Sequence, residues 1–249
     1  MEKVVIITGA YGGIGTGLVK AYLKYDYKVV ATGRRKIELI ALKELIKEEL
    51  NKDIDIFKVD GTLEQDVIDC IEYVKNKYGR LDTLVNNAQA SKSGLMLVEH
   101  SKEDFDLAIN TGLYATFYFM KYSYPLLKES KGNVINFASG AGLFGKISQS
   151  SYAAAKEGIR GLSRVAATEW GVDGIGVNVI CPLVMTPKLE SWKEEYPDAY
   201  EKTIRDIPMR RMADSENDIG ELCIFLSSDK GSYITGETFT IQGGSGLRP

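Results

Sequence analysis

Tyr152 and Lys156 are the residues whose types and spacing most directly predict chemistry. They stand in S-Y-A-A-A-K, and on a helix, residues four apart project from one face. A phenol with a reference pKa near ~10 is a poor base at neutral pH, but a nearby ammonium and a positively charged nicotinamide both favour phenolate. Tyr152 could therefore give a proton to a carbonyl oxygen, or take one from an alcohol, as hydride is transferred. Ser139, upstream in N-F-A-S-G, could hydrogen-bond the same oxygen.

A glycine-rich turn near the start of the chain predicts a nucleotide site. The segment T-G-A-Y-G-G-I-G runs from Thr8 to Gly15, directly after V-V-I-I. Glycines at 9, 13 and 15 would let backbone N–H groups approach a pyrophosphate at a helix N-terminus. Glycines also serve ordinary tight turns. The strand, turn and helix order, together with Tyr152 and Lys156, indicates a nicotinamide-dependent oxidoreductase.

The end of the second predicted strand bears on the choice of cofactor. NAD-dependent enzymes place an acidic residue there for the ribose hydroxyls, whereas this sequence reads A-T-G-R-R. Arg34 and Arg35 could form charge-assisted hydrogen bonds with a 2′-phosphate, which favours NADP(H). The alternative is that both arginines merely begin an exposed helix.

Short β-rich runs alternate with helical stretches along the chain, and they predict an α/β fold. Because several runs are apolar almost throughout, we expect parallel strands covered by helices on both faces. The segment I-E-L-I-A-L-K-E-L-I-K-E-E-L has the spacing of an amphipathic crossover helix. The prediction is a single-domain, doubly wound (Rossmann) sheet over residues 1–249, with its ligand site at the carboxyl ends of the strands. The seven candidate strands are V-V-I-I-T, Y-K-V-V-A-T-G, I-D-I-F-K-V-D, L-D-T-L-V-N-N, G-N-V-I-N-F-A, I-G-V-N-V-I and E-T-F-T-I.

A long stretch from Pro182 to about Asp214 contains four of the six prolines. It is predicted to be irregular and to cover a substrate pocket, because it begins at the end of a strand. A peripheral surface excursion is the alternative.

Composition excludes several classes of protein. A net charge of −3 offers no general attraction to nucleic acid or to an anionic membrane, and no apolar run approaches the ~20 residues that span a bilayer. We expect neither partner, and the absence of a leader pattern predicts a cytoplasmic protein. Cys70, Cys181 and Cys223 are expected to be buried free thiols and not zinc ligands. His100, the only histidine, is expected to be solvated or locally bonded beside Ser101, a candidate helix N-cap.

These motifs together resemble the short-chain dehydrogenase/reductase family over essentially the whole chain. The resemblance implies that Lys156 also holds the nicotinamide ribose, that Asn110 in A-I-N-T-G-L completes a proton-relay tetrad with Ser139, Tyr152 and Lys156, and that Asp60 in K-V-D-G-T contacts the adenine. It also implies a homotetramer. The candidate cofactor-binding residues are Gly9, Tyr11, Gly13, Ile14, Gly15, Arg34, Arg35, Asp60, Gly61, Asn87, Ala88, Tyr152, Lys156, Pro182 and Thr186.

The chain departs from the family pattern at two places. The family's N-N-A-G reads Asn86-Asn87-Ala88-Gln89, and its P-G segment reads Pro182-Leu183. Both changes fall where nicotinamide and substrate should meet. Gln89 is therefore a candidate substrate-binding residue beside Ser139 and Tyr152, and Thr186 still corresponds to a threonine that contacts the carboxamide.

The substrate is expected to be an apolar small molecule that is a ketone or a secondary alcohol. N-N-A-Q-A-S, G-L-Y-A-T-F, F-A-S-G-A-G-L-F-G and the tail G-L-R-P resemble the NADP-dependent bacterial 12α-hydroxysteroid dehydrogenases, which act on bile acids. A 3-oxoacyl carrier-protein reductase, a sugar or polyol dehydrogenase and a non-enzymatic NADP sensor are the alternatives. Apolar residues that could receive a steroid, or could instead be core, are Leu143, Phe144, Met185, Leu189, Trp192 and Tyr196.

Overall fold

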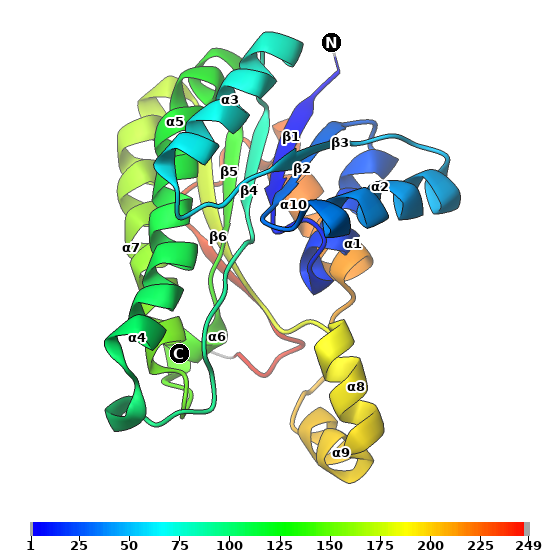
Figure 1. Ribbon diagram of the computed structural model, residues 1–249, viewed down its shortest axis with the longest axis vertical. Helices are drawn as coiled ribbons and strands as arrows, with labels where there is room; N and C mark the ends of the chain where they lie inside the picture. The colour runs from blue at the N-terminus through cyan, green and yellow to red at the C-terminus, as the bar shows by residue number, and fades with distance from the viewer. Residues whose placement is uncertain (1, 247–249) are drawn as a thin grey trace.

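The computed structural model describes residues 2–246, apart from the side chain of Lys188. Most of the G-L-R-P tail and both extreme ends of the predicted domain therefore lie outside the described residues. Helices flank a central sheet, which Figure 1 shows nearly edge-on. The strands are β1 Val4–Thr8, β2 Lys28–Gly33, β3 Asp55–Lys58, β4 Thr83–Asn86, β5 Asn133–Phe137, β6 Gly176–Pro182 and β7 Thr238–Ile241. The α-helices are α1 Gly13–Lys24, α2 Lys36–Leu50, α3 Glu64–Tyr78, α4 Lys102–Ala108, α5 Ala115–Ser130, α6 Gly140–Phe144, α7 Ser150–Trp170, α8 Pro187–Glu195, α9 Pro197–Arg205 and α10 Glu221–Leu226.

The sheet confirms the predicted doubly wound architecture. Its seven strands lie in the order β3-β2-β1-β4-β5-β6-β7, and every adjacent pair is parallel. The order reverses between β1 and β4, so the loops that follow these two strands diverge to opposite faces. Such a divergence opens a crevice at the carboxyl ends of the strands.

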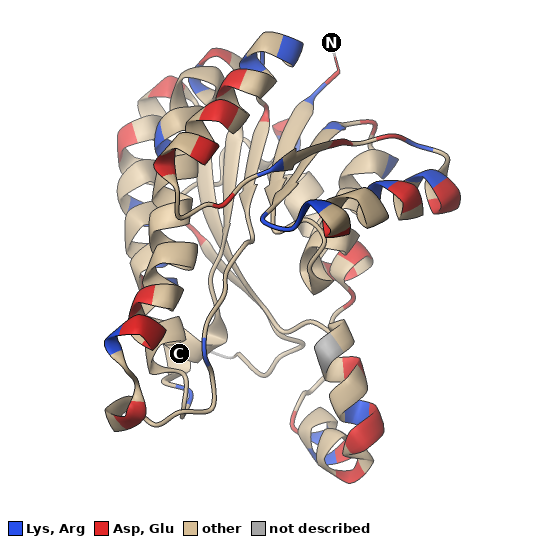
Figure 2. Ribbon diagram, viewed as in Figure 1, with Lys and Arg blue, Asp and Glu red and all other residues tan. Residues whose placement is uncertain are grey.

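Both faces of the sheet are buried, which explains the nearly continuous apolar strands. In β1, Val5 and Ile7 pack in one core cluster, while Val4 and Ile6 pack in the other. The first cluster includes residues of α1, α2 and α10, and the second includes residues of α3, α5 and α7 (Figure 1). The charged residues lie mainly on the outer surfaces of the helices (Figure 2).

The stretch from Pro182 to Asp214 corrects a prediction, because much of it is helical. Pro187 and Pro197 occupy the first turns of α8 and α9. A proline at that position costs little, since the N–H that it lacks has no partner within the helix. The two helices project from a narrow neck, where Val184 and Ala213 form a parallel bridge (Figure 1).

The structure tests the predictions for Ser101, for His100 and for the three cysteines. Ser101 caps α4 as predicted, since its hydroxyl accepts a hydrogen bond from the Asp104 N–H at 3.1 Å. The prediction for His100 is wrong, because both ring nitrogens are buried with no hydrogen-bond partner among the described residues. The three cysteines are buried, as predicted.

A π-helical segment, η2 Ile109–Tyr114, joins α4 to α5. Its wider turn changes the direction of the side chains along this helix relative to an α-helix. Within the described residues, no helix is both long enough and apolar enough to cross a bilayer.

Candidate active site

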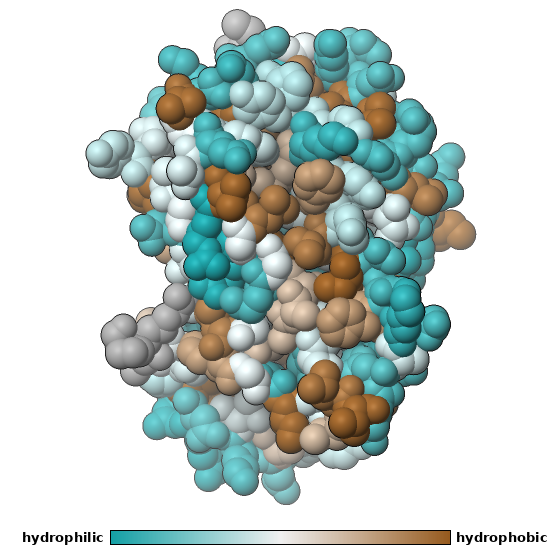
Figure 3. All heavy atoms as spheres, turned by 90° about the vertical axis from the view of Figure 1, so that its left-hand side faces the viewer, coloured by the Kyte–Doolittle hydropathy of each residue, from teal (hydrophilic) through white to brown (hydrophobic). Residues whose placement is uncertain are grey.

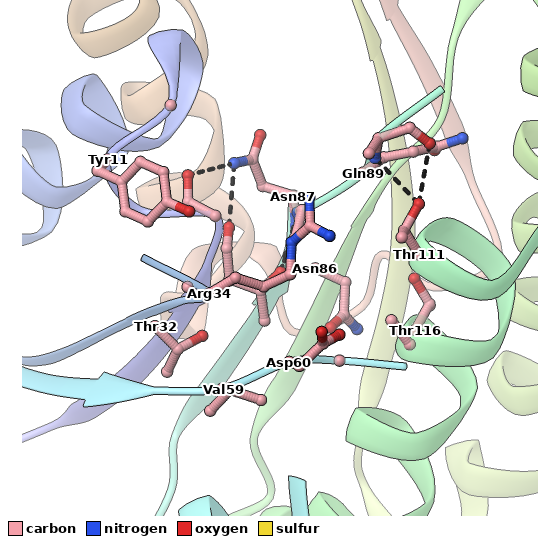
Figure 4. Close-up of a pocket in the computed structure, with 18 of the residues that line it drawn as sticks. Tyr11, Thr32, Arg34, Val59, Asp60, Asn86, Asn87, Gln89, Thr111 and Thr116 are labelled. Carbon is pink, nitrogen blue, oxygen red and sulfur yellow. Dashed lines mark hydrogen bonds between the residues drawn. The ribbon is translucent and has the colours of Figure 1, made fainter. Parts of the chain in front are cut away.

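A pocket of about 440 Å³ lies at the predicted crevice. This volume falls within the range typical of sites for small molecules and cofactors. The pocket is bordered by the turn after β1, by the ends of β2 and β3, and by the segment after β4 (Figure 4). Among the predicted cofactor residues, its lining includes Gly9, Tyr11, Gly13, Ile14, Arg34, Arg35, Asp60, Gly61, Asn87, Ala88 and Thr186.

The glycine turn is shaped by close backbone contacts. Gly9 has φ +63°, a left-handed conformation that favours glycine. A Cβ on Gly15 would lie 2.2 Å from the Gly9 carbonyl oxygen, so a side chain there would displace the turn. Because α1 begins at Gly13 without a side-chain cap, its first N–H groups remain available to an anion.

Tyr11, Gly33 and the two arginines form the end of the pocket next to β2. The Tyr11 ring lies across Gly33, where a Cβ would be 2.3 Å from Cε1 of the ring. The Arg35 guanidinium lies 5.0 Å from the ring centroid and pairs with Glu38 at 3.2 Å. Arg34 forms no ion pair among the described residues and extends into the pocket (Figure 4). Figure 2 shows this basic turn between β2 and α2.

The segments after β3 and β4 close the pocket from the other side. Asp60 accepts hydrogen bonds from the Thr62 N–H at 3.0 Å and the Thr62 hydroxyl at 2.8 Å, which fixes the turn that carries Gly61. The Asn87 amide nitrogen donates to the carbonyl oxygens of Thr8 at 3.0 Å and Gly9 at 3.2 Å. These bonds hold the segment after β4 against the glycine turn.

Ser139, Tyr152 and Lys156 lie together, next to the end of β5. Ser139 caps α6, its hydroxyl accepting from the Ala141 N–H at 3.1 Å, and it also hydrogen-bonds Tyr152. The Lys156 ammonium donates to the Phe137 carbonyl oxygen at 2.6 Å and lies 5.5 Å from the centroid of the Tyr152 ring. A phenol, a hydroxyl and an amine are thus arranged to exchange a proton with one bound oxygen.

Burial dominates the electrostatics of these groups. It lowers the pKa of Lys156 to about 7, because a low-dielectric environment disfavours the ammonium. Burial also raises the pKa of Tyr152, and the hydrogen bond with Ser139 only partly opposes that shift. In the protein alone burial outweighs the other influences on Tyr152, and the predicted effect of Lys156 on the phenolate stays a prediction.

Three predicted site residues need separate comment. Asn110 lies in η2, is exposed and is outside the pocket lining, so its part in a tetrad stays a prediction. Pro182 ends β6 outside the pocket lining. Thr186 caps α8 by accepting from the Leu189 N–H at 3.4 Å, and it lies against Gly13.

The predicted apolar substrate residues divide into two groups. Leu143 packs against Ala138, Val179 and Cys181 and so belongs to the core. Phe144 is 52% exposed and Tyr196 50%, whereas Met185, Leu189 and Trp192 are half-buried. The Trp192 ring lies 6.2 Å from that of Tyr200, which joins α8 to α9.

Several lining residues were not found from the sequence. Thr111 and Thr116 enter the pocket from η2 and α5, and Thr32 and Val59 enter from the ends of β2 and β3. The position of Thr32 at the end of an apolar strand was an available signal. No motif marks the two helical threonines, since only the packing of the helix turns them inward.

Comparisons with known proteins agree with this geometry. A protein-family model described as enoyl-(acyl carrier protein) reductase matches residues 9–246. The chain is similar to a 12alpha-hydroxysteroid dehydrogenase from a Clostridium species, at 52% identity over 99% of this chain and 98% of that protein. It is similar to a 3-oxoacyl-[acyl-carrier-protein] reductase, FabG, from Thermotoga maritima, at 34% identity over 97% of both chains. Among solved structures, ElxO with NADP bound superposes with a TM-score of 0.92 at 31% identity, covering 98% of this chain and 99% of ElxO.

Proposed function

The chain belongs to the short-chain dehydrogenase/reductase family, and from this premise we propose that it is an NADP(H)-dependent oxidoreductase of a hydroxysteroid, acting at the 12α position of bile acids. The observation that carries the reaction type is the group Ser139, Tyr152 and Lys156 at the end of β5. These residues are not in the pocket lining, but β5 is next in the sheet to β4, and the segment after β4 lines the pocket. The steroid is supported by the 52% identity to the clostridial enzyme.

The pocket fits NADP(H) in two respects. The glycine turn leaves the space that a Cβ would fill, next to the N-terminus of α1, which suits a pyrophosphate. Arg34, without an acidic partner among the described residues, suits the 2′-phosphate. When bound, NADP(H) supplies or accepts the hydride.

The protein's own residues provide the proton transfer. In ketone reduction, Tyr152 gives its phenolic proton to the carbonyl oxygen while Ser139 donates a hydrogen bond to that oxygen. Lys156 is held by the Phe137 carbonyl, and in its protonated form it can stabilise the tyrosinate left behind. In alcohol oxidation the same groups act in reverse.

Substrate covering is assigned to the segment from Pro182 to Asp214. Its helices α8 and α9 leave the body through the neck at Val184 and Ala213, next to Thr186 in the pocket wall. The half-buried Leu189 and Trp192 give α8 an apolar side that suits a rigid hydrocarbon. This covering segment belongs to a single domain, as the sequence predicts.

The experiment that tests this function follows the oxidation of NADPH with a panel of ketones. We expect turnover of a 12-oxo bile acid, and little with acetoacetyl thioesters or ketoses. Preference for the thioester would identify an acyl carrier-protein reductase, and preference for the ketose a polyol dehydrogenase. NADPH binding with no turnover of any ketone would indicate a sensor.

The variant Tyr152→Phe tests the proton-transfer step separately from cofactor binding. It should lower kcat by roughly 10²–10⁴-fold, the effect typical of losing a general acid. The dissociation constant for NADPH should stay within a few-fold, because the phenolic oxygen contributes little to holding the cofactor. A variant with wild-type turnover would contradict the assigned role of Tyr152.

A further inference from the structure

The ring of Tyr11 fills the space in which residue 33 would carry a side chain. Gly33 is the last residue of β2 and is buried. A Cβ added to it would lie 2.3 Å from Cε1 and 3.1 Å from Cδ1 of the tyrosine ring. Gly33 is not among the glycines with positive φ, so its backbone conformation is open to other residues. The glycine is therefore required by the neighbouring ring and not by the path of the backbone.

Position 33 bears on the choice between NADPH and NADH. Proteins of this fold that bind NAD place an acidic side chain near the end of the second strand, for the ribose hydroxyls. In this chain the end of β2 lies against the glycine turn, because the Ala10 N–H donates to the Thr32 carbonyl oxygen at 3.1 Å. Tyr11 and Gly33 both line the pocket. The ring therefore takes the place of an acidic side chain that residue 33 could otherwise present to the pocket.

The same tyrosine holds the basic turn that follows β2. Its hydroxyl accepts a hydrogen bond from the Arg35 N–H at 3.4 Å, and the Arg35 guanidinium lies 5.0 Å from the centroid of the ring. A guanidinium at this distance from a tyrosine ring is attracted to it. Arg34 lies between Gly33 and Arg35, so Tyr11 contacts the turn on both sides of the arginine that extends into the pocket (Figure 4).

We propose that Tyr11 is a specificity-determining residue for the cofactor. Its ring keeps an acidic side chain out of position 33, and its contacts with Arg35 hold the basic turn at the pocket wall, where Arg34 suits a 2′-phosphate. Tyr11 and Gly33 act as a pair, because a side chain on residue 33 displaces the ring, whereas removal of the ring makes room for that side chain. This inference rests on the proposed NADP(H)-dependent function.

Dissociation constants of NADPH and NADH, measured by fluorescence titration, test this pair. Gly33→Asp alone should bind both cofactors at least about 10-fold more weakly than the wild type, because its side chain meets the ring. Tyr11→Ser alone should lower the preference for NADPH over NADH by about 3-fold or more, the effect of losing the cation–π contact. The double variant should bind NADH more tightly than either single variant and should prefer it to NADPH, since the carboxylate then has room and repels the 2′-phosphate.

Two further variants separate the ring from the hydroxyl, and the space from the charge. Tyr11→Phe keeps the ring, so its ratio of the two constants should stay within about 2-fold of the wild-type ratio. Gly33→Ala should weaken both cofactors equally, and its combination with Tyr11→Ser should restore the binding of both without reversing the preference. Thermal melting identifies the variants that fold, and the alanine variants decide alone if an aspartate variant does not.

Three results would overturn the proposal. The first is a Tyr11→Ser protein with the wild-type ratio of constants, which would make the tyrosine part of the packing of the turn only. The second is a Gly33→Asp or Gly33→Ala protein that binds both cofactors as the wild type does while Tyr11 is present. The third is a Tyr11→Phe protein with the ratio of Tyr11→Ser, which would assign the effect to the hydroxyl.

The unaltered protein measures the proposed function separately. If it binds neither cofactor, or prefers NADH, the NADP(H) assignment fails before any variant is compared. If it prefers NADPH and all the folded variants share its ratio, only the role of Tyr11 fails.

Discussion

At the scale of single residues, the site is built from side chains whose surroundings determine their charge. Lys156 is almost completely buried and donates to a carbonyl oxygen, with no carboxylate partner among the residues that the structure describes. Within the same residues Arg34, exposed at the pocket, forms no ion pair, whereas Arg35 is engaged by Tyr11 and Glu38. The two basic positions predicted as equivalent therefore differ in what they can offer a ligand.

Replacing both arginines should change the cofactor preference. Arg34→Ser with Arg35→Ser should weaken NADPH far more than NADH, because only NADPH carries the 2′-phosphate. Each charged hydrogen bond contributes roughly 1.5–3 kcal/mol. Arg34→Ser alone should account for most of the effect, since Arg35 already has an anionic partner.

Fluorescence titration gives the dissociation constants of NADPH and NADH for the wild type and for each variant. Lys36→Ser is the matched control, an exposed cation next in the chain, and it should leave the ratio of the constants unchanged. Equal weakening of NADPH and NADH by the double change would reduce the arginines to surface charge.

Lys156 should make the free energy of unfolding depend on pH. Burial lowers its pKa from 10.5 to about 7 in the folded protein, so between these values the unfolded chain binds more protons and stability rises with pH. Lys156→Met removes this contribution. Relative to the variant, the wild type should therefore gain stability between about pH 7 and about pH 10, by at least about 1 kcal/mol given ~1.4 kcal/mol per unit of pKa difference.

Urea unfolding gives the free energy of unfolding of the wild type and of Lys156→Met at both pH values. Subtracting the value of the variant from that of the wild type at each pH cancels the contribution of all other titrating groups. Lys36→Met, at an exposed lysine, provides the comparison for loss of a surface charge. If the free energies of unfolding of the wild type and of Lys156→Met differ by the same amount at both pH values, the buried amine keeps an ordinary pKa.

At the scale of elements, the strands could be predicted from the local sequence pattern. Features that depend on the packing of the folded chain could not be predicted in this way. All the strands were located because parallel strands covered on both faces are apolar throughout. The helices α8 and α9 were missed because prolines that begin helices look like prolines that prevent them. The direction of the Asn110 side chain could not be predicted because η2 is π-helical, and nothing in A-I-N-T-G-L shows which of its residues faces the pocket.

The glycine turn gives an element-scale prediction about close packing. Gly15→Ala should abolish NADPH binding and lower stability, because its Cβ would lie 2.2 Å from a backbone oxygen. Clashes of this kind force backbone shifts that cost about 1–3 kcal/mol. Gly171→Ala is the control. That glycine has helical dihedral angles and no atom within 4 Å of a new Cβ.

Isothermal titration calorimetry measures NADPH binding, and thermal melting measures the stability of the two variants. We expect Gly171→Ala to bind as the wild type does and to melt at the same temperature or higher, since alanine restricts the unfolded chain more than glycine. A Gly15→Ala protein that binds NADPH normally would mean that the turn can relax without consequence for the cofactor.

At the scale of the whole molecule, one side of the protein carries several exposed apolar side chains. Figure 3 faces the side formed by α4, α5 and α7 and shows apolar side chains gathered near its middle. Phe105, Leu107, Tyr114, Phe117 and Val165 are all at least 36% exposed on these elements and on η2. A contiguous exposed apolar surface is typical of a subunit interface. We infer that this face joins subunits, and the homotetramer that the family resemblance implies stays a prediction.

A charge in the centre of this face should separate the subunits without unfolding them. Phe117 is 38% exposed, so Phe117→Glu adds no buried charge to an isolated subunit, but it would bury one in an interface, where an unpaired carboxylate is costly. Light scattering after size exclusion should therefore show a tetramer for the wild type and a smaller species for the variant. Val172→Glu, at a residue 91% exposed just beyond α7, should keep the wild-type mass. A wild type that elutes as a monomer, or a Phe117→Glu protein of unchanged mass, would show that this apolar face does not join subunits.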